Sequence, residues 1–506
     1  MSSQQSTPEA LPEDRPSLVS RILRREDPAT YLRKDAHLNR VLRVRDFLAL
    51  GVGTIVSASI FTLPGQVAAQ HTGPAVALSY IGAAIVAGLV AFSYAEMASV
   101  MPFAGSAYSW INVVFGEIWG WIAGWALLAE YLLAVAFVAS GLSSNLQGLI
   151  GTVGLTLPTN LANPMGTSGG FVDLFAVLAI LIVFALLSRG VSAAARVQNV
   201  LVVLKIAAIA LFIIVGVTAL HPENYVPFIP DYQVNADGTA FGGWQGIYAG
   251  VSMIFLAYIG FDSIAANSAE AKDPQRTMPR GILGSLGIAV VLFVSVSLVL
   301  VGMNHYSVYG GTSAEPIGYA LRNAGHPVIA VVVQTIAVVG MFTALIGMLL
   351  AGSRLLYSFG RDRLLPGWLG QLNERHLPNR ALLVITIITI VVGAFFPFTF
   401  LSQLVSAGTL IAFVFVSLGV YALRRREGRD LPEASFKVPF YPVLPALGAL
   451  ASAFVFIGLN VDAQIVAGIW FVIGLVLYLS YGVWHSRAGR DEPVPEPDRD
   501  LRASGE

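Results

Sequence analysis

The chain has 506 residues, of which 56% are hydrophobic and only 12% are charged. Soluble globular proteins carry about 25% charged residues, so these side chains are too few to cover a wetted surface, and a soluble enzyme is excluded. The 30 basic and 30 acidic residues give a formal net charge of zero, which argues against a nucleic-acid-binding protein. Because cysteine is absent, disulfide scaffolds and thiolate metal sites are excluded too.

Apolar segments of about 20 residues, long enough to cross a hydrocarbon core of about 30 Å, recur along the whole chain. Their richness in Gly, Ala, Ser and Leu suits close packing between membrane helices. They predict an all-α integral membrane protein with twelve transmembrane helices. We place these spans at residues 46–70, 75–99, 117–149, 171–188, 196–219, 246–271, 280–303, 327–358, 381–397, 402–423, 442–460 and 464–485.

Basic residues mark every second connection between the predicted spans. The alternate connections, near 150–170, 220–245, 304–326 and 398–401, contain a single basic residue, Arg322. Since cytoplasmic connections are the ones enriched in Lys and Arg, both termini are predicted to be cytoplasmic. The expected location is the plasma (inner) membrane, crossed many times.

The predicted organisation has seven parts. A cytoplasmic amino-terminal tail (1–45) precedes a first repeat of five spans (46–220), and an extracellular connection (221–245) leads to a second repeat (246–424). A cytoplasmic connection (425–441), two last spans (442–485) and a cytoplasmic carboxyl-terminal tail (486–506) follow.

The first and sixth spans carry residues that interrupt helices. The middle of the first span reads Thr54-Ile-Val-Ser-Ala-Ser-Ile-Phe61, and the sixth has Gly260 and Asp262 at mid-depth. Interrupted helices at matching positions of two halves mark the midplane site of secondary transporters. The two spans lie five apart, which predicts a five-plus-five inverted repeat with two appended helices. The alternative is that these small residues only let helices approach one another.

An interrupted helix exposes N–H groups where its second half begins and carbonyls where its first half ends. The N–H groups of Ala58 and Ser59 are therefore expected to face a carboxylate. The carbonyls of Ile55, Leu256 and Ile259 are expected to face an ammonium group. A ligand that carries both groups side by side is an α-amino acid.

Six motifs occur in a family-specific order. They are GVGTIVSASIF in the first span, YAEMASVMPFAGSAYSW after the second, GWALLAEYLLAVA in the third, AYIGFDSIAANSAEAKDPQRTMPRGI in the sixth, GSRLLYSFGRDRLLP after the eighth and FKVPFYPVLPAL before the eleventh. Together they resemble the amino acid–polyamine–organocation superfamily, and within it the bacterial relatives of the cationic amino acid transporters. The resemblance implies a permease that imports amino acids by alternating access, often with protons.

The first interruption departs from the family pattern. Where the family usually shows I-G-x-G-I-F, this chain has Ser57 and Ser59 in place of the glycines. Serine supplies the same backbone N–H, but its side chain occupies room beside the expected carboxylate. Either the hydroxyls join substrate binding, or the site is narrowed.

Lys205 lies inside the fifth span. A lysine at that depth costs roughly 3 kcal/mol on insertion scales, so a functional role is the default hypothesis. Snorkelling of its long stem to the interface is the alternative. The resemblance implies proton coupling, because in proton-coupled relatives a lysine of this span occupies the place of sodium in sodium-coupled ones. Thr343 in the eighth span is its candidate polar neighbour.

Three further residues are candidates for the substrate site. Glu130 in the third span is expected to contact the substrate side chain or the proton path, or else to be a hydrogen-bonded structural acid. Phe261 could pack over the bound amino acid as a gate. Asp262 either holds the sixth-span interruption together or touches the ligand. Glu96 and Glu117, near span ends, are expected to be solvated at the interface.

Other chemistries find no support in the sequence. There is no G-x-x-x-x-G-K-[ST] phosphate loop and no H-E-x-x-H zinc motif, so neither ATP hydrolysis by that route nor zinc catalysis is predicted. The protein is expected not to be an enzyme and to need no cofactor. Its predicted partners are an amino acid, protons and the lipid bilayer. An amino acid exchanger and a receptor that binds without transport remain alternatives.

Overall fold

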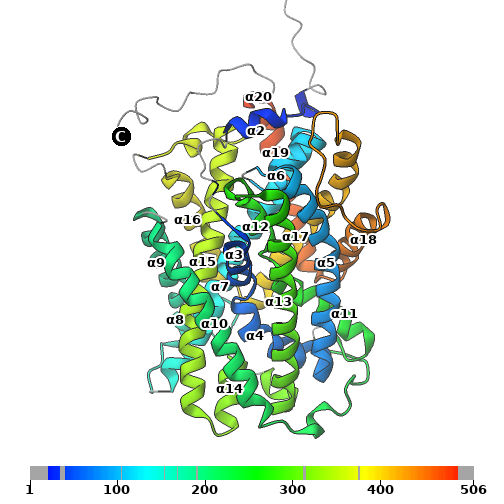
Figure 1. Ribbon diagram of the computed structural model, residues 1–506. Coiled ribbons are helices and arrows are strands. Elements are labelled where there is room, and N and C mark those ends of the chain that lie inside the picture. The colour runs from blue at the N-terminus through cyan, green and yellow to red at the C-terminus, as the bar shows by residue number, and fades with distance from the viewer. Residues whose placement is uncertain are drawn as a thin grey trace, which may run out of the picture.

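The computed structural model describes residues 21–34, 40, 42–103, 105–152, 154–167, 169–189, 192–236, 238–310, 315–373 and 377–487, without the side chains of 32–34 and 192–199. Most of both predicted tails lies outside these residues. The described chain is a bundle of long helices lying roughly side by side (Figure 1).

The first half of the chain forms helices where the apolar segments predict them. A short helix α2 (Pro28–Lys34) precedes the bundle. The helices that follow are α3 (Val44–Ile55), α4 (Ala58–Val67), η1 (Ala68–Thr72), η2 (Gly73–Ala75), α5 (Val76–Val100), α6 (Ala107–Val114), α7 (Glu117–Gly151), α8 (Thr159–Ala162), α9 (Leu174–Arg189), α10 (Ser192–Val217) and η3 (Pro222–Tyr225).

The second half opens with the one two-stranded sheet of the described residues, β1 (Gln233–Val234) antiparallel to β2 (Ala240–Phe241). The helices that follow are α11 (Gly243–Ile254), η4 (Phe255–Tyr258), α12 (Phe261–Ala266), η5 (Ser268–Glu270), α13 (Pro274–Met303), η6 (Tyr306–Tyr309), α14 (Pro316–Asn323), α15 (Pro327–Arg361), η7 (Gly367–Gly370), α16 (Asn379–Phe395), α17 (Phe398–Arg426), α18 (Val443–Ile457), α19 (Val461–Leu477), η8 (Tyr478–Gly482) and α20 (Val483–His485).

Eight helical stretches of the described residues are long and apolar enough to cross a membrane, and three shorter apolar helices, α9, α16 and α18, accompany them. One of the eight, Ala58–Val100, joins α4 to α5 through η1 and η2. The prediction of a mostly helical protein with several helices of membrane-spanning length is thus confirmed. The predicted connection at 398–401 is wrong, because α17 already begins at Phe398, directly after Pro397.

The long helices place their ends on two opposite faces of the bundle. Helices α2 and α20 lie at the upper end in Figure 1, which we call the terminal face, and α14 lies at the opposite end, the distal face. Between them, α3 packs against α10, α13 and α15, while α7 packs against α15, α16 and α17. The interrupted first segment is therefore enclosed by helices from both halves of the chain.

Both predicted interruptions are present. Helix α3 ends at Ile55 and α4 begins at Ala58, with Val56 and Ser57 between them in non-helical conformations. In the sixth segment, α11 tightens into the 3-10 turn η4, and Ile259 and Gly260 separate it from α12. The two interruptions lie against each other, since a Cβ atom on Gly260 would meet the backbone N of Ile55 at 3.0 Å.

Gly260 satisfies two requirements that exclude other residues. Its φ of 125° lies in a region that side-chain-bearing residues rarely adopt. A side chain there would also press on Thr54, whose Cβ would be 3.1 Å away. The junction of the two interrupted helices therefore depends on the absence of a side chain at this position.

We predict that Gly260→Ala lowers the thermal stability of the purified protein by several degrees, because the strained backbone alone costs about 1–2 kcal/mol and the contact with α3 adds to it. Gly287→Ala on α13 is the control, since a Cβ there meets nothing within 4 Å. Thermal unfolding in detergent measures both variants. Equal melting temperatures for the two would contradict the prediction.

Candidate functional site

The two interrupted helices are joined by hydroxyl groups. Thr54 Oγ1 donates to the Leu50 carbonyl of its own helix at 2.8 Å and lies 3.3 Å from the Gly260 carbonyl oxygen. Ser263 Oγ lies 3.4 Å from Thr54 Oγ1. Ser263 Oγ also donates to the Gly260 carbonyl at 2.5 Å. Freed backbone groups at membrane depth must find partners inside the protein, and Ser263 satisfies the carbonyl that the sixth-segment interruption exposes.

The predicted substrate residues gather at this junction or beside it, and all are buried, with at most 6% of their surface exposed. They are Ile55, Ser57, Ala58, Ser59, Leu256, Ile259, Phe261 and Glu130. In this conformation the junction is closed to solvent on both faces. A substrate could reach it only after helices move.

The N–H groups of Ala58 and Ser59 begin α4, and among the described residues neither has a hydrogen-bond acceptor. The next N–H, of Ile60, bonds the Ser57 carbonyl at 3.4 Å. The two free donors lie at the positive end of the α4 dipole. This arrangement suits a bound carboxylate.

The three predicted carbonyls differ in their availability. The Ile55 carbonyl accepts from the Ser57 N–H at 3.0 Å, and the Leu256 carbonyl accepts from the Ile259 N–H at 3.1 Å. The Ile259 carbonyl has no donor among the described residues. It is the one best placed to receive an ammonium group.

The two serines of the first interruption lie in different surroundings. Ser59 Oγ donates to the Ile55 carbonyl at 3.4 Å, so its hydroxyl is turned back toward α3. Ser57 is the residue before α4, and its side chain makes no capping hydrogen bond. Of the two hydroxyls, the one of Ser57 is left to interact with a ligand.

Apolar side chains flank the start of α4. A Cβ on Gly141 of α7 would meet the Ala58 Cβ at 2.6 Å and the Phe398 ring at 3.2 Å. Phe398 in turn packs on Phe137 with ring centroids 4.3 Å apart. The missing side chain at Gly141 lets α7 approach the interruption, and the wall it forms there is apolar.

Phe261 belongs to an aromatic cluster behind the junction. Its ring lies 5.3 Å from Tyr94 and 5.1 Å from Phe413, measured between centroids. The side chain is fully buried. In this conformation Phe261 packs between α5 and α17.

Asp262 holds the sixth-segment interruption. Its Oδ1 accepts from the Gly260 N–H at 3.0 Å, and its Oδ2 accepts from the Tyr131 hydroxyl of α7 at 3.0 Å. Both oxygens are thus occupied by the protein. Of the two roles considered for Asp262, this geometry favours the structural one.

Glu130 is fully buried next to Asp262 and Thr409. Neither of its carboxylate oxygens makes a hydrogen bond of good geometry with the described residues. Thr409 and Asp262 are its neighbouring polar side chains, and a buried carboxyl group with only such weak contacts is costly. It remains available to a substrate or a proton.

Lys205 connects three helices. Its Nζ donates to the Gly53 carbonyl at 2.9 Å, to Thr343 Oγ1 at 3.2 Å and to the Gly340 carbonyl at 3.4 Å. The side chain is fully buried, which excludes snorkelling in this conformation. Its acceptors are all neutral, so the amine could lose a proton without breaking an ion pair. Gly53 lies two residues before the end of α3, which links the lysine directly to the first interruption.

Several residues of the junction were not predicted. Thr54 and Ser263 looked like ordinary small polar residues of membrane helices, and nothing in their spacing says that they meet. Gly340 was also missed; a Cβ there would lie 3.1 Å from Cδ of Lys205, so this glycine makes room for the lysine stem. Its position one helical turn before Thr343 was the available signal.

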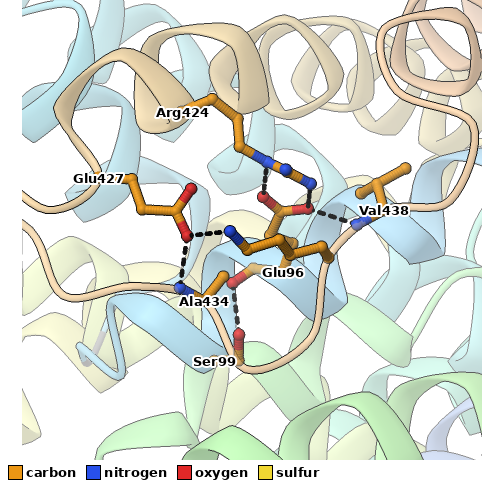
Figure 2. A network of polar contacts seen from close by, with 7 residues as sticks. Glu96, Ser99, Arg424, Glu427, Ala434 and Val438 are labelled. Atoms are coloured by element: carbon orange, nitrogen blue, oxygen red, sulfur yellow. Dashed lines mark hydrogen bonds and ion pairs between the residues drawn. The ribbon is translucent and has the colours of Figure 1, made fainter.

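A network of charges closes the terminal face. Figure 2 shows Glu96 of α5 receiving two hydrogen bonds from Arg424 of α17, at 2.5 and 2.9 Å, and one from the Val438 N–H at 2.5 Å. The expectation that Glu96 is solvated is wrong, because the residue is fully buried. The loop between α17 and α18 lies over it and brings a donor that sequence position alone does not reveal.

A second pair holds the same loop. Glu427 Oε1 receives Lys437 Nζ at 2.9 Å and the Ala434 N–H at 2.8 Å (Figure 2). Partial burial raises the pKa of Glu427, but these two donors outweigh it and hold the pKa below its usual range. The loop is therefore fastened at both of its ends at neutral pH.

Glu117 was expected to be solvated as well, and this is also wrong. It is 1% exposed and accepts from the Tyr478 hydroxyl at 2.9 Å and from Ser486 Oγ. These partners come from η8 and the segment after α20. The last helical segment covers the start of α7 and shields its first acid.

The distal face has a network of its own. Glu315, directly before α14, pairs with Arg322 and accepts from Gln334 of α15. Burial raises the pKa of Glu315, and Arg322 opposes this rise. Arg322, the single Lys or Arg of the connections predicted to be extracellular, thus pairs with an acid on the distal face of the bundle.

Comparison with known proteins decides the family. The model of the family described as "Amino acid permease" matches residues 42–481. The chain belongs to the amino acid permease family. The predicted superfamily and its transport function are confirmed, and the protein is a permease rather than an enzyme.

Three relatives show where this permease lies within the family. It is 63% identical to the branched-chain amino acid permease BcaP of Lactococcus lactis, over 91% of this chain and 98% of the relative. It is 36% identical to the methylthioribose transporter of Bacillus subtilis, over 90% and 95%. It is 34% identical to the vacuolar cationic amino acid transporter 4 of Arabidopsis thaliana, over 79% and 65%.

We predict that Asp262→Ala destabilises this permease by about 2–4 kcal/mol, through loss of the cap at α12 and an unsatisfied Tyr131 hydroxyl. Asp262→Asn keeps an acceptor for the Gly260 N–H and should cost much less. Thermal unfolding of the two variants checks this difference. If the Asn variant folds normally but no longer binds an amino acid, Asp262 touches the ligand and the structural assignment is wrong.

Proposed function

We propose that this permease imports branched-chain amino acids across the plasma membrane by alternating access, as a proton symporter. The observation that carries the proposal is the 63% identity, over almost the full length of both chains, to a permease named for branched-chain amino acids. Two features of the site support it: the free N–H groups at the start of α4 and the apolar wall beside them.

The apolar wall favours a substrate with an apolar side chain. If the substrate carboxylate lies at Ala58 and Ser59, its side chain extends toward Gly141, Phe398 and Phe137. An aliphatic side chain would bury there without leaving a polar group unpaired. A cationic side chain would need a partner, and Glu130 is the candidate for such a role among the predicted site residues.

For the whole chain we propose twelve spans, with residues 46–220 and 246–424 as two inverted repeats and 442–485 as two appended helices. The support is the pair of interruptions at matching positions, α3/α4 and α11/α12. The positive-inside pattern supports a cytoplasmic terminal face, which places the connection at 425–441 and both tails in the cytoplasm. The segment at 221–245 and Arg322 would then lie outside.

The transport cycle in this proposal opens one face at a time. Opening toward the cytoplasm requires the Glu96–Arg424 pair and the loop that carries Val438 to separate or to move as a unit. Opening toward the outside requires α14 and its Glu315 network to move. The closed junction of the present conformation is an intermediate of such a cycle.

Proton coupling is assigned to Lys205 together with Thr343. A charged Nζ binds the Gly53 carbonyl through a charge-assisted hydrogen bond, which is roughly twice as strong as a neutral one. Loss of the proton weakens the hold on the last turn of α3, directly before the interruption. The protonation state of Lys205 could therefore bias the position of α3, and with it the direction in which the site opens.

Two alternatives lead to different measurements. In an exchanger, Lys205 would be a fixed structural charge, and counterflow would proceed without proton flux. In a receptor, an amino acid would bind without accumulation. Uptake of radiolabelled leucine into proteoliposomes, with and without an imposed proton gradient, separates both from a symporter.

We predict that leucine, isoleucine and valine raise the melting temperature of the purified permease more than any other amino acid, because a ligand that binds only the folded state stabilises it by mass action. The panel should include arginine, lysine and methylthioribose, the ligands suggested by the other relatives. A larger shift with one of these would overturn the branched-chain assignment.

We predict that Lys205→Ala abolishes accumulation of leucine driven by a proton gradient in proteoliposomes. Leucine binding, measured by thermal shift, should be reduced far less, because Nζ bonds α3 and α15 and not the substrate positions. Thr343→Val, which removes one of the three acceptors, should shift the pH dependence of uptake without abolishing it. Uphill uptake with normal pH dependence in Lys205→Ala would refute the assignment.

A further inference from the structure

A basic pocket lies on the terminal face, away from the transport site. It has a volume of about 300 Å³ and is lined by residues before α2, at the end of α6 and on the last turns of α17. Its lining consists of Arg25, Val114, Phe115, Tyr421, Ala422, Arg425 and Arg426. Three arginines thus line one small space together with apolar and aromatic residues.

The three arginines differ in the hydrogen bonds and ion pairs that their guanidinium groups already make. Arg426 donates to Asp430 at 3.0 and 3.2 Å and to the Val113 carbonyl. Arg25 and Arg425 are exposed and make no ion pair with the described residues. The Asp430 carboxylate interacts electrostatically with Arg25 as well as with Arg426. Asp430 is the one acid of the described residues that forms an ion pair with an arginine of this pocket, so the pocket keeps a net positive charge.

Nearby acids do not neutralise this charge. Glu26, the chain neighbour of Arg25, lines a different and much smaller pocket with Tyr108 and Asp362. The unused donors of Arg25 and Arg425 therefore point to an anion. A guanidinium group binds phosphate oxygens in pairs, so phosphate is the chemistry that this pocket fits.

The surface beside the pocket is apolar. Leu418, Tyr421, Ala422 and Arg425 stand at positions i, i+3, i+4 and i+7 and therefore share one face of α17. Leu418 is 40% exposed. Trp119 of α7, also 40% exposed, packs on Phe415, three residues before Leu418 in α17, with ring centroids 5.8 Å apart. Exposed leucine and tryptophan followed by arginine describe a helix that leaves the hydrocarbon region and enters the headgroup region.

We propose that this pocket binds the phosphate of an anionic phospholipid headgroup, with its acyl chains along the exposed face of α17. Basic pockets between membrane helices on the cytoplasmic side are suited to such headgroups. A pocket of about 300 Å³ is at the small end of the range for small-molecule sites, which fits a phosphoglycerol group. The site is separate from the amino acid site and does not depend on the coupling mechanism.

Binding of a phosphate in this pocket would affect the loop between α17 and α18, which covers Glu96 on the terminal face. Arg426 lies in the pocket and also holds Asp430, four residues later in the loop. The same loop carries Val438, whose N–H binds Glu96. A phosphate that shares Arg426 with Asp430 changes how firmly the loop is held, so anionic lipid would alter the rate of transport as well as stability.

The test uses the full-length protein, purified and depleted of lipid, and titrated with short-chain phosphatidylglycerol. The double variant Arg25→Gln/Arg425→Gln should bind this lipid about 30-fold more weakly than the unmodified protein, from the worth of an arginine at an anionic headgroup. Short-chain phosphatidylcholine and inorganic phosphate are the comparison ligands. The readouts are the lipid-dependent melting temperature and lipid binding by native mass spectrometry.

The matched control is Arg363→Gln/Arg429→Gln, which removes the same charge from two exposed arginines that do not line the pocket. This variant should bind phosphatidylglycerol like the unmodified protein. An unchanged melting-temperature shift with leucine shows that each variant is folded. Equal loss in both double variants, or no loss in the first, would overturn the proposal. Equal stabilisation by inorganic phosphate would overturn the lipid assignment.

Discussion

The structure depends on how two broken helices satisfy their backbone at membrane depth. Each break frees carbonyl and N–H groups that lipid cannot satisfy. The Gly260 carbonyl accepts a hydrogen bond from Ser263, and the Gly260 N–H donates to Asp262. The donors left over, on Ala58 and Ser59, are those that a substrate carboxylate can use. The freed backbone groups of Gly260 are thus hydrogen-bonded within the protein, whereas two N–H groups at the first break have no acceptor among the described residues.

The remaining buried polar groups are arranged around this junction. Lys205 reaches it through the Gly53 carbonyl, and Tyr131 reaches it through Asp262. Gly141, Gly260 and Gly340 lack the side chains that would keep α7, α3 and the lysine stem apart. A movement of α3 or α12 therefore changes the proposed proton site and the substrate site together, which is the property that coupled transport needs.

On the terminal face, the loop between α17 and α18 takes part in three separate sets of contacts. The residues between α17 and α18 cover Glu96, pair Glu427 with Lys437 and bring Asp430 to Arg426 at the basic pocket. The loop lies where the proposed cytoplasmic exit must open. In the proposed cycle, its contacts would serve as a gate, and the proposed lipid site would lie beside them.

The sequence by itself determined the class, the helices and the position of both breaks. Apolar length and the small polar residues at Thr54 to Phe61 and at Gly260 were sufficient, because each reports a local physical requirement of a chain in lipid. The motifs also identified the family. Lys205 and Thr343 were named together from their depth and from the family resemblance, and the structure places Nζ of Lys205 3.2 Å from Oγ1 of Thr343.

What only the tertiary structure decided were contacts between distant segments: Thr54 with Gly260, Asp262 with Tyr131, and Glu96 with Arg424 and Val438. Glu96 and Glu117 were misjudged for the same reason, since closeness to a helix end does not reveal which other segment covers it.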